Sequence, residues 1–374
     1  MKVKQRLGFV LILVVSLGLL VSGCVSRGVS NPGWTVLAIN QDIAYAVLNT
    51  GKVVALDAAS GSEKWVYPIA QASGGLFRRQ PAGDPPLNAV YGVPVFTDEL
   101  VLAGTYDNKV VAFVQATGLK AWEYVAQGSV MGGMVVDGEQ VYLGGSDGRV
   151  YALKTSAAGA ELLWSTQAAK HAIWGVPVLT DDLVIVGSLD HYVYALKRAD
   201  GELVWDHDMG AAVAGDITLA DDLVLVGGVA NKLTALEIAS GDVVWESQFK
   251  QWVWGEAFLD GGVVYVSSLD GQLHALDPRT GETKWDTVLQ GAARSGPALA
   301  GDYLVIGTAE GNIYRVEKAT GKAELLYKSA GRILSRPAVS GNRVLVGTDS
   351  GQILALDTTV VGGAPVWQYP AVTK

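Results

Sequence analysis

One structural unit recurs eight times along this 374-residue chain, and each copy ends on an aromatic residue. Five copies align without gaps around a turn glycine: ALDAASGSEKW, AFVQATGLKAW, ALKRADGELVW, ALEIASGDVVW and ALDPRTGETKW. Together with three looser copies, they end at Trp65, Trp122, Trp164, Trp205, Trp245, Trp285, Tyr327 and Trp367. The intervals between these residues are 57, 42, 41, 40, 40, 42 and 40. A nearly fixed period of this size indicates stacked copies of one unit.

Each copy is predicted to form four short antiparallel strands. The copy from Gly175 to Trp205 contains the runs VPVLT, LVIVG, YVYALK and ELVW, separated by turns rich in Asp and Gly. Runs of this length and composition are typical of strands joined by tight hairpins. The glycine before each aromatic residue supplies the positive φ that such a turn requires.

A single sheet of about 40 residues cannot bury both of its faces, so the copies must pack face to face in a ring. The eight aromatic residues are then predicted to wedge between neighbouring sheets as inter-blade residues. The predicted fold class is all-β: an eight-bladed β-propeller of four-stranded antiparallel blades, forming one domain over residues 33–370 with a tail at 371–374. Each blade is expected to use contiguous sequence, so that side-chain packing between the first and last blades closes the ring.

The repeat also resembles a known family. ALDPRTGETKW reads Ala, any residue, Asp, two residues, Thr-Gly, three residues and Trp, which is similar to the PQQ-like repeat of the quinoprotein-like propellers. The resemblance covers nearly all of the chain after its first 32 residues. It implies the propeller fold but no single function, because such propellers serve both quinone-dependent dehydrogenases and proteins without chemistry.

The residues present do not favour an enzyme. For the dehydrogenases, the resemblance implies a Glu, Asn and Asp set for calcium, an acidic base and commonly a disulfide between adjacent cysteines. This chain has one cysteine, no such ligand set can be assigned, and its four histidines show no metal-binding spacing. We therefore expect no catalytic residue, no metal and no cofactor, and keep a PQQ-dependent dehydrogenase as the third alternative.

The first 23 residues are predicted to be a lipoprotein signal peptide. Lys2, Lys4 and Arg6 precede an apolar run over residues 7–21, which has the form of a secretory signal. The run ends in Val-Ser-Gly-Cys and resembles a lipobox, which implies that Cys24 is lipidated after cleavage. An ordinary signal with a cysteine near its cleavage site stays as the alternative.

Residues 24–32 then form the lipidated cysteine and a short tether. The eight residues 25–32 span at most about 28 Å, which would keep the propeller close to a bilayer. Val25 follows the cysteine where Asp would mark retention, so in a two-membrane bacterium the lipobox resemblance implies the periplasmic face of the outer membrane. In a one-membrane bacterium it implies the external face of the cytoplasmic membrane.

Charge narrows the range of partners. The chain has 28 basic and 37 acidic residues, a net charge of −9, and loss of three basic residues with the signal makes the mature chain −12. An acidic protein of this kind argues against nucleic acid or anionic lipid as the main partner. We expect envelope proteins as partners, with the membrane reached through the lipid on Cys24.

Departures from the repeat indicate where a ligand could bind. Loops between blades and the turns from second to third strands lie on one face, here called the upper face. Small residues begin the first strand of seven blades, and large or charged residues flank them on the same side of the strand. The resulting candidate ligand mouth, which could clamp a planar anionic ligand, comprises Trp174, Trp254, Arg294, Arg336, Asp216 and Glu256. In the alternative interpretation, the aromatics pack between blades and the charges pair across the channel.

A second departure is the 57-residue interval, which carries about 16 extra residues relative to the common period. The segment 71–91 is rich in Pro and Gly and belongs to a loop of the upper face. Phe77, Arg78 and Arg79 form a candidate partner loop, because aromatic and arginine side chains dominate binding hot spots. A variable, solvated loop is the alternative.

Among non-enzymatic relatives, the chain is most similar to the propeller lipoprotein of the machinery that assembles outer-membrane β-barrels. That resemblance implies a scaffold whose surface loops bind periplasmic domains of a β-barrel insertase. We therefore expect a non-catalytic, lipid-anchored envelope scaffold with a monomeric propeller. The alternative is a lipid-anchored receptor for a small molecule or glycan that binds at the channel mouth.

Overall fold

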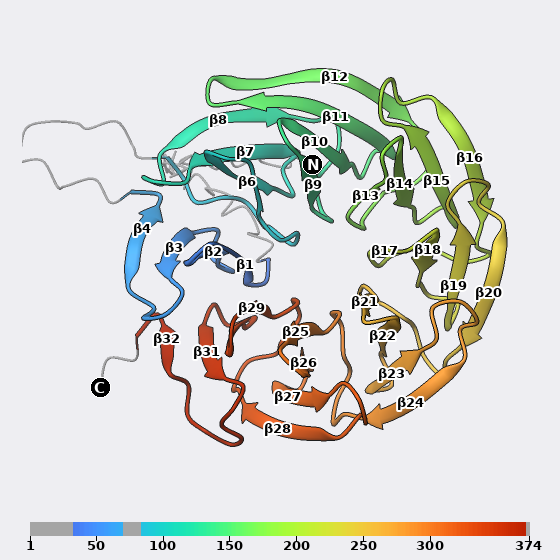
Figure 1. Ribbon diagram of the computed structural model, residues 1–374. Coiled ribbons are helices and arrows are strands. Elements are labelled where there is room, and N and C mark those ends of the chain that lie inside the picture. Colours follow the sequence, from blue (N-terminus) through green and yellow to red (C-terminus); the bar gives the residue numbers. More distant parts are fainter. Residues whose placement is uncertain (1–32, 70–83, 372–374) are drawn as a thin grey trace, which may run out of the picture. The chain divides into compact units, whose positions relative to one another are not determined.

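The computed structural model describes residues 33–69 and 84–371, which contain 32 strands in eight four-stranded sheets. The sheets are arranged as the blades of a ring around a central axis (Figure 1). This confirms the predicted all-β, eight-bladed propeller. The described residues include no helix, and hence none that could span a membrane.

Every blade is an antiparallel meander that runs in chain order from an inner strand near the axis to an outer strand at the circumference of the ring (Figure 1). The strands of blades 1 and 2 are β1 Val36–Asn40, β2 Ile43–Val47, β3 Val53–Asp57, β4 Glu63–Tyr67, β5 Val95–Phe96, β6 Leu100–Gly104, β7 Lys109–Val114 and β8 Lys120–Val125. Those of blades 3 and 4 are β9 Met134–Asp137, β10 Gln140–Gly144, β11 Arg149–Ser156, β12 Gly159–Gln167, β13 Val178–Leu179, β14 Leu183–Gly187, β15 Tyr192–Lys197 and β16 Leu203–Asp208.

The remaining four blades repeat the pattern. Blades 5 and 6 contain β17 Ile217–Ala220, β18 Leu223–Val226, β19 Lys232–Glu237, β20 Val243–Gln248, β21 Phe258–Asp260, β22 Val263–Ser268, β23 Gln272–Leu276 and β24 Thr283–Val288. Blades 7 and 8 contain β25 Ala298–Ala300, β26 Tyr303–Gly307, β27 Asn312–Glu317, β28 Ala323–Lys328, β29 Ala338–Ser340, β30 Arg343–Gly347, β31 Ile353–Asp357 and β32 Trp367–Tyr369. Blades 1 and 8 each use contiguous sequence, so no strand is exchanged between them.

The apolar core lies between blades rather than inside them. Eight buried clusters are present in the described residues, and each combines side chains from two neighbouring blades. The second and third strands supply most of these side chains, since they are covered on both faces; Val101 and Leu102 of β6, for example, are both fully buried. Stability of one blade therefore depends on its neighbours.

Tryptophans of the outer strands connect seven of the eight junctions. In seven blades this tryptophan pairs with an alanine of the third strand, and its indole N–H donates to a backbone carbonyl of the next blade. The donor and acceptor pairs are Trp65–Gln115, Trp122–Ser156, Trp164–Arg198, Trp205–Ile238, Trp245–Pro278, Trp285–Lys318 and Trp367–Ala58, at 2.8 to 3.2 Å. Six of the rings also lie against the turn glycine of the next blade; a Cβ on Gly241 would come within 2.6 Å of the Trp205 ring.

Blade 7 is built differently. Tyr327, the aromatic residue of its copy, pairs with Ile313 because the β-bulge has moved along the strand, and Tyr327 is only half-buried. The fully buried side chain at the junction with blade 8 is its neighbour Leu326. Arg315 occupies the position of the paired alanine, and its Nη1 donates to Thr358 O at 2.6 Å, replacing the indole N–H. Glu324 accepts two further bonds from Arg315, at 2.8 and 2.6 Å.

The ring closes between blades 8 and 1. The cluster that joins them contains Leu37 and Val54 of blade 1 and Leu345 of blade 8. Besides the Trp367 bond, Asn49 donates to Asp349 O at 2.9 Å and Ser335 donates to Thr35 O at 2.9 Å. Side-chain packing and a few hydrogen bonds thus join the two ends of the propeller.

Candidate functional site

The six residues of the candidate ligand mouth all line one cavity of about 550 Å³ at the centre of the propeller. Its rim is a ring of one side chain from each blade: Trp34, Tyr91, Met131, Trp174, Ala214, Trp254, Arg294 and Leu334. The residues two positions after these rim residues form a second ring, here called the deeper ring. Five blades contribute Val or Gly to the deeper ring, and the other three contribute Asp216, Glu256 and Arg336. These residues precede or begin the inner strands, which start two or three residues later than the small residues suggested.

Glycines between the two rings bring the blades into direct backbone contact. A Cβ on Gly175 would lie 2.6 Å from the carbonyl oxygen of Gly215, and one on Gly132 or Gly215 would overlap the carbonyl oxygen of Trp174 or Trp254. Small residues at this position are therefore required for eight inner segments to meet around one axis. The close approach also fixes the spacing of the rim side chains.

Arg336 and Glu256 form an ion pair across the deeper ring, from blade 8 to blade 6. Blade 7 carries Gly296 at the corresponding position, and a Cβ there would lie 2.9 Å from Glu256 Cγ, so the glycine leaves room for the pair. The Arg336 guanidinium also lies 5.1 Å from the centre of the Phe258 ring. This part of the deeper ring matches the alternative in which the charges pair across the channel.

Asp216 is held differently from Glu256. Its Oδ1 accepts the backbone N–H of Val176 from blade 4 at 2.7 Å. Burial raises the pKa of Asp216 to about 6, although the Val176 N–H and the charge of Arg336 both act to lower it. Burial likewise lowers the pKa of Arg336, against the attraction of Asp216. Asp216 also borders a second cavity of about 630 Å³ on the other side of the deeper ring, so it lies at the waist of the channel.

The rim is predominantly aromatic and apolar. Trp254 stacks on Trp252 with ring centres 6.2 Å apart and 21° between the planes, and Trp34 meets Tyr91 edge to face at 4.7 Å. Arg294 is exposed and forms no ion pair within the described part of the chain. Such a wall of large rings with few polar groups is typical of ligand sites.

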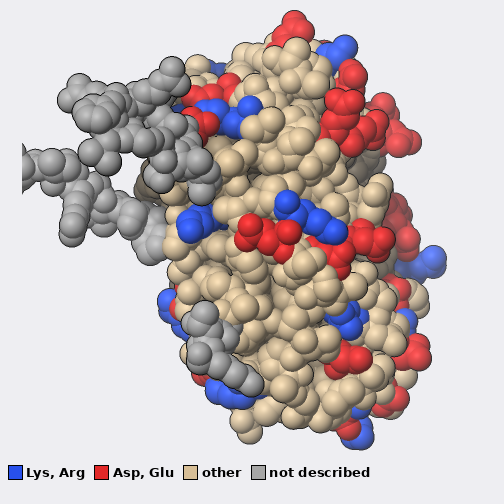
Figure 2. Space-filling model, turned by 90° about the vertical axis from the view of Figure 1, so that its left-hand side faces the viewer, with Lys and Arg blue, Asp and Glu red and all other residues tan. Residues whose placement is uncertain are grey.

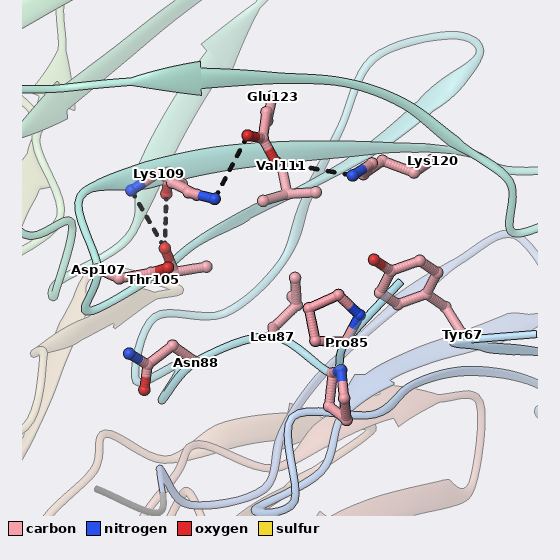
Figure 3. A pocket seen from close by; sticks show the side chains of 11 residues that line it. Tyr67, Pro85, Leu87, Asn88, Thr105, Asp107, Lys109, Val111, Lys120 and Glu123 are labelled. Carbon is pink, nitrogen blue, oxygen red and sulfur yellow. Dashed lines mark hydrogen bonds and ion pairs between the residues drawn. The ribbon is translucent and has the colours of Figure 1, made fainter. Parts of the chain in front are cut away.

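The candidate partner loop residues Phe77, Arg78 and Arg79 lie outside the described residues, as does Cys24. The chain after residue 83 borders a cavity of about 280 Å³ between blades 1 and 2 (Figure 3). Pro85 and Leu87 face Tyr67 there, and Glu123 lies between Lys109 and Lys120, at 3.3 and 3.7 Å (Figure 3).

The surface around this region carries charges of both signs. Figure 2 shows the side of the propeller that lies at the left in Figure 1, where Lys and Arg alternate with Asp and Glu among uncharged residues. Surface ion pairs include Lys64 with Asp57 at 3.3 Å and Lys120 with Asp84 at 3.5 Å. Burial and the nearby charge of Asp84 raise the pKa of Tyr67 to about 12.

One exposed apolar surface was not predicted from the sequence. In three neighbouring blades, the two residues before the outer-strand tryptophan are exposed and apolar. They belong to strands β12, β16 and β20 and are Leu162, Leu163, Leu203, Val204, Val243 and Val244. The signal is readable as ELLW, ELVW and DVVW, in contrast to SEKW and ETKW elsewhere. Apolar surface repeated over neighbouring blades is typical of a protein interaction site.

Metal binding finds no support in the described ranges 33–69 and 84–371. They contain no group of three or more His, Cys, Asp or Glu residues placed to hold a metal ion. His274 is instead bonded through Nδ1 to Asp286 Oδ1 at 2.7 Å.

Comparison with solved structures supports the fold. A computationally designed protein, Ika8, superimposes with a TM-score of 0.71 at 17% identity, covering 87% of this chain and 96% of that one. BamB from Moraxella catarrhalis superimposes with a TM-score of 0.68 at 18% identity, covering 87% of this chain and 99% of that one. At these identities the likeness is one of architecture.

Curated relatives carry one description, outer membrane protein assembly factor BamB. The relative from Bordetella pertussis is 26% identical over 169 residues, covering 45% of this chain and 41% of its own length. The relative from Salmonella typhimurium is 30% identical over 156 residues, covering 42% of this chain and 37% of its own length. In these alignments the chain spans only about two fifths of each relative.

The match to a family model extends much further. The model described as outer membrane protein assembly factor BamB matches residues 26–157, 154–251, 189–295 and 269–374, which overlap and leave no gap between them. The matched range contains all eight blades. The chain therefore belongs to the family of the outer membrane protein assembly factor BamB.

Proposed function

We propose that this protein is a non-catalytic assembly factor of the cell envelope, which holds partner proteins while β-barrel proteins are inserted into the outer membrane. The observation that carries the proposal is the family match from residue 26 to residue 374, which coincides with a complete ring of eight blades. In such a ring the core lies between the blades, so the loops of both faces are free to differ and to bind partners.

The proposed anchor is lipid on Cys24. Residues 1–23 would be removed as the signal peptide, and residues 24–32 would tether the propeller to the periplasmic face of the outer membrane. More than one acyl chain is needed for stable residence in a membrane, and a lipidated N-terminal cysteine supplies more than one.

The proposed partner surface is the upper face around the inserted segment, with Phe77, Arg78 and Arg79 as contacts to a periplasmic domain of the insertase. Two guanidinium groups beside an aromatic ring favour a partner surface that is acidic and partly apolar. The described residues that flank this segment border the cavity between blades 1 and 2, which offers a concave surface beside it.

The anchor and the partner surface can be tested in a Gram-negative strain that lacks its own assembly factor of this family. The wild-type gene is expected to restore outer-membrane β-barrel levels, whereas Cys24→Ala should release the protein into the soluble periplasmic fraction and reduce the rescue. Arg78→Ala with Arg79→Ala should leave the protein anchored but lower its crosslinking to the insertase.

A matched control is Arg279→Ala with Lys284→Ala, which removes the same charge from exposed residues at the third turn and fourth strand of blade 6. This control should crosslink and rescue as the wild type does. Full rescue by the Arg78 and Arg79 variant would reject the proposed partner loop, and absence of rescue by the wild-type gene would count against the assembly role itself.

A further inference from the structure

Two tryptophans of the channel mouth are separated by a residue with a small side chain. On the rim, Trp174 of blade 4 and Trp254 of blade 6 flank Ala214 of blade 5, whose side chain is a single methyl group. The backbones of these three blades approach closely at Gly175 and Gly215, so the segments that carry the two tryptophans lie on either side of Ala214. Trp254 is held in place by its stack on Trp252.

A carboxylate of the deeper ring follows Ala214. Asp216 is two residues beyond Ala214 on the same segment and lines the same cavity. Its Oδ1 is occupied by the Val176 N–H, and among the described residues Oδ2 accepts no hydrogen bond and Asp216 forms no ion pair. Asp216 is partly exposed and lines the cavity.

Asp216 forms no ion pair with the other charges of the deeper ring, although the charge of Arg336 acts on it. Arg336, the one cation in that ring, is already paired with Glu256. Two carboxylates and one guanidinium give the waist of the channel a net charge of −1 when Asp216 is ionised. A positive group would balance the charge of this waist, while Arg294 on the rim adds a positive charge of its own to the cavity.

We propose that the mouth binds an organic cation, an ammonium or a guanidinium group, between Trp174 and Trp254 and above Asp216. Indole faces attract cations, and a carboxylate at the end of the aromatic walls fixes the position of the charge. The cation can belong to an arginine or lysine side chain of a peptide or to a free polyamine. This site is independent of the proposed assembly role and differs from the planar anionic ligand that the sequence suggested.

Binding can be measured by calorimetry on the purified full-length protein in a nonionic detergent. N-acetylarginine amide serves as the cation, N-acetylcitrulline amide as its neutral near-isostere and N-acetylglutamate amide as the anion. The arginine probe is expected to bind at least about tenfold more tightly than the citrulline probe. Spermidine, measured in parallel, shows whether a free polyamine is preferred to a peptide side chain.

Variants of the lining residues test which side chains bind the arginine probe. Asp216→Asn keeps an acceptor for the Val176 N–H but removes the charge, and should weaken the arginine probe by about tenfold; Trp174→Ala and Trp254→Ala should each weaken it by about threefold. Trp254→Phe preserves an aromatic ring and should therefore lose less affinity for the probe than Trp254→Ala does. Arg294→Gln should bind the probe equally or up to about threefold more tightly, because a nearby positive charge is removed.

The matched control is Glu310→Gln, which neutralises an exposed carboxylate in a turn of blade 7, outside the channel. It should bind the probe as the wild type does. The affinity for the arginine probe should also fall as the pH is lowered through about 6, because Asp216 gains its proton there. The other charged groups that face the mouth are Glu256, Arg336 and Arg294. The Asp216→Asn variant should show no such fall.

Equal binding of the arginine and citrulline probes would overturn the proposal, as would undiminished binding by Asp216→Asn. Binding of the glutamate probe alone, with its loss in Arg294→Gln, would show that the mouth takes an anion instead. Failure of every probe to bind would reject the site.

Discussion

The outer-strand tryptophans combine two interactions that a phenylalanine could not supply together. Trp245 is 7% exposed, its ring lies against the turn glycine of blade 6, and its indole N–H donates to Pro278 O at 2.9 Å. The ring excludes water from the junction, and the N–H satisfies a carbonyl in the third turn of the next blade. The side chain thus joins two sheets that share no backbone hydrogen bonds.

Substitution of Trp245 should separate the two contributions. Trp245→Ala is expected to lower the free energy of unfolding by about 3–5 kcal/mol, because it removes a large buried ring. Trp245→Phe should cost about 1–2 kcal/mol, because it leaves the Pro278 carbonyl without its donor. Urea unfolding followed by circular dichroism measures both. Trp252→Phe, at an exposed indole, is the control, and equal losses for the Ala and Phe variants would contradict this division.

The ionised Asp216 should make the fold less stable near neutral pH. Burial raises its pKa from 3.8 to about 6, so the folded state holds this proton more tightly than the unfolded state does. For an acid with a raised pKa, the cost of ionisation is absent well below pH 4, grows between about pH 4 and 6, and is complete above that range.

Asp216→Asn should therefore stabilise the protein by about 1–3 kcal/mol above pH 6, and the gain should shrink as the pH falls toward 4. Urea unfolding across this pH range measures the difference between variant and wild type. A pH-independent difference would show that the charge of Asp216 is not its cause. A group that lowers stability in this way is typical of a binding site rather than of a structural position.

At the scale of elements, blade 7 shows how one junction is made without an indole. Arg315 in β27 replaces the alanine that pairs with tryptophan elsewhere, and donates to Thr358 O, the carbonyl at the repeat position of the usual indole acceptor. Leu326 fills only part of the space, and a cavity of about 200 Å³ remains between blades 7 and 8, lined by Leu326, Leu356 and Val360. The turn of blade 8 is also longer than its siblings, and neither of its glycines, Gly362 and Gly363, lies against an aromatic ring.

Arg315 should consequently contribute more to the free energy of unfolding than a surface arginine does. Arg315→Ala is expected to lower the free energy of unfolding by about 2 kcal/mol through loss of the hydrogen bond from a charged donor to Thr358. Arg315→Lys should recover only part of this, because a lysine cannot bind Glu324 and Thr358 with a planar fork. Urea unfolding tests the order Arg, Lys, Ala. Arg332→Ala, at an exposed arginine paired with Asp349, is the control and should have little effect.

The turn glycines show that local sequence can specify an element. Gly61 has a φ of 71° and Gly201 has a φ of 73°, at the positions where the repeat predicted left-handed turns. This geometry depends on a few adjacent residues, so it was readable from ALDAASGSEKW and its copies. In blade 7 an Arg–Glu pair replaces the Ala–Trp pair, and this exchange was not readable from the sequence. Tyr327 stands near the expected spacing, so nothing in the sequence indicated that the β-bulge is shifted.

For the whole molecule, the junction between blades 8 and 1 is distinctive because no peptide links the two blades. Every other pair of neighbouring blades is also connected by the chain, which limits how far the blades can separate. Closure depends on the shared cluster, on Trp367 and on bonds such as that from Tyr369 to Glu63 at 2.9 Å.

Opening of the ring should therefore begin at this junction. In hydrogen exchange measured by mass spectrometry, Trp367→Ala should reduce protection of β1 to β4 and β29 to β32 by about tenfold or more, while leaving blades 4 and 5 protected. Trp205→Ala is the comparison, since it removes an equivalent ring between two blades that the chain connects. Uniform loss of protection around the ring in Trp367→Ala would show that the propeller opens as one cooperative unit instead.

The sequence by itself determined the number of blades, their four-stranded meander, the turn glycines and the side of each inner segment that faces the channel. These features repeat about every forty residues and arise from local hydrogen bonding and side-chain alternation, so eight copies report them eight times. Only the tertiary structure decided that Arg336 pairs with Glu256 while Asp216 keeps a free oxygen, and that Arg315 closes the junction at blade 7. These contacts join residues of different blades at positions where the copies differ, and their geometry depends on how the whole ring closes.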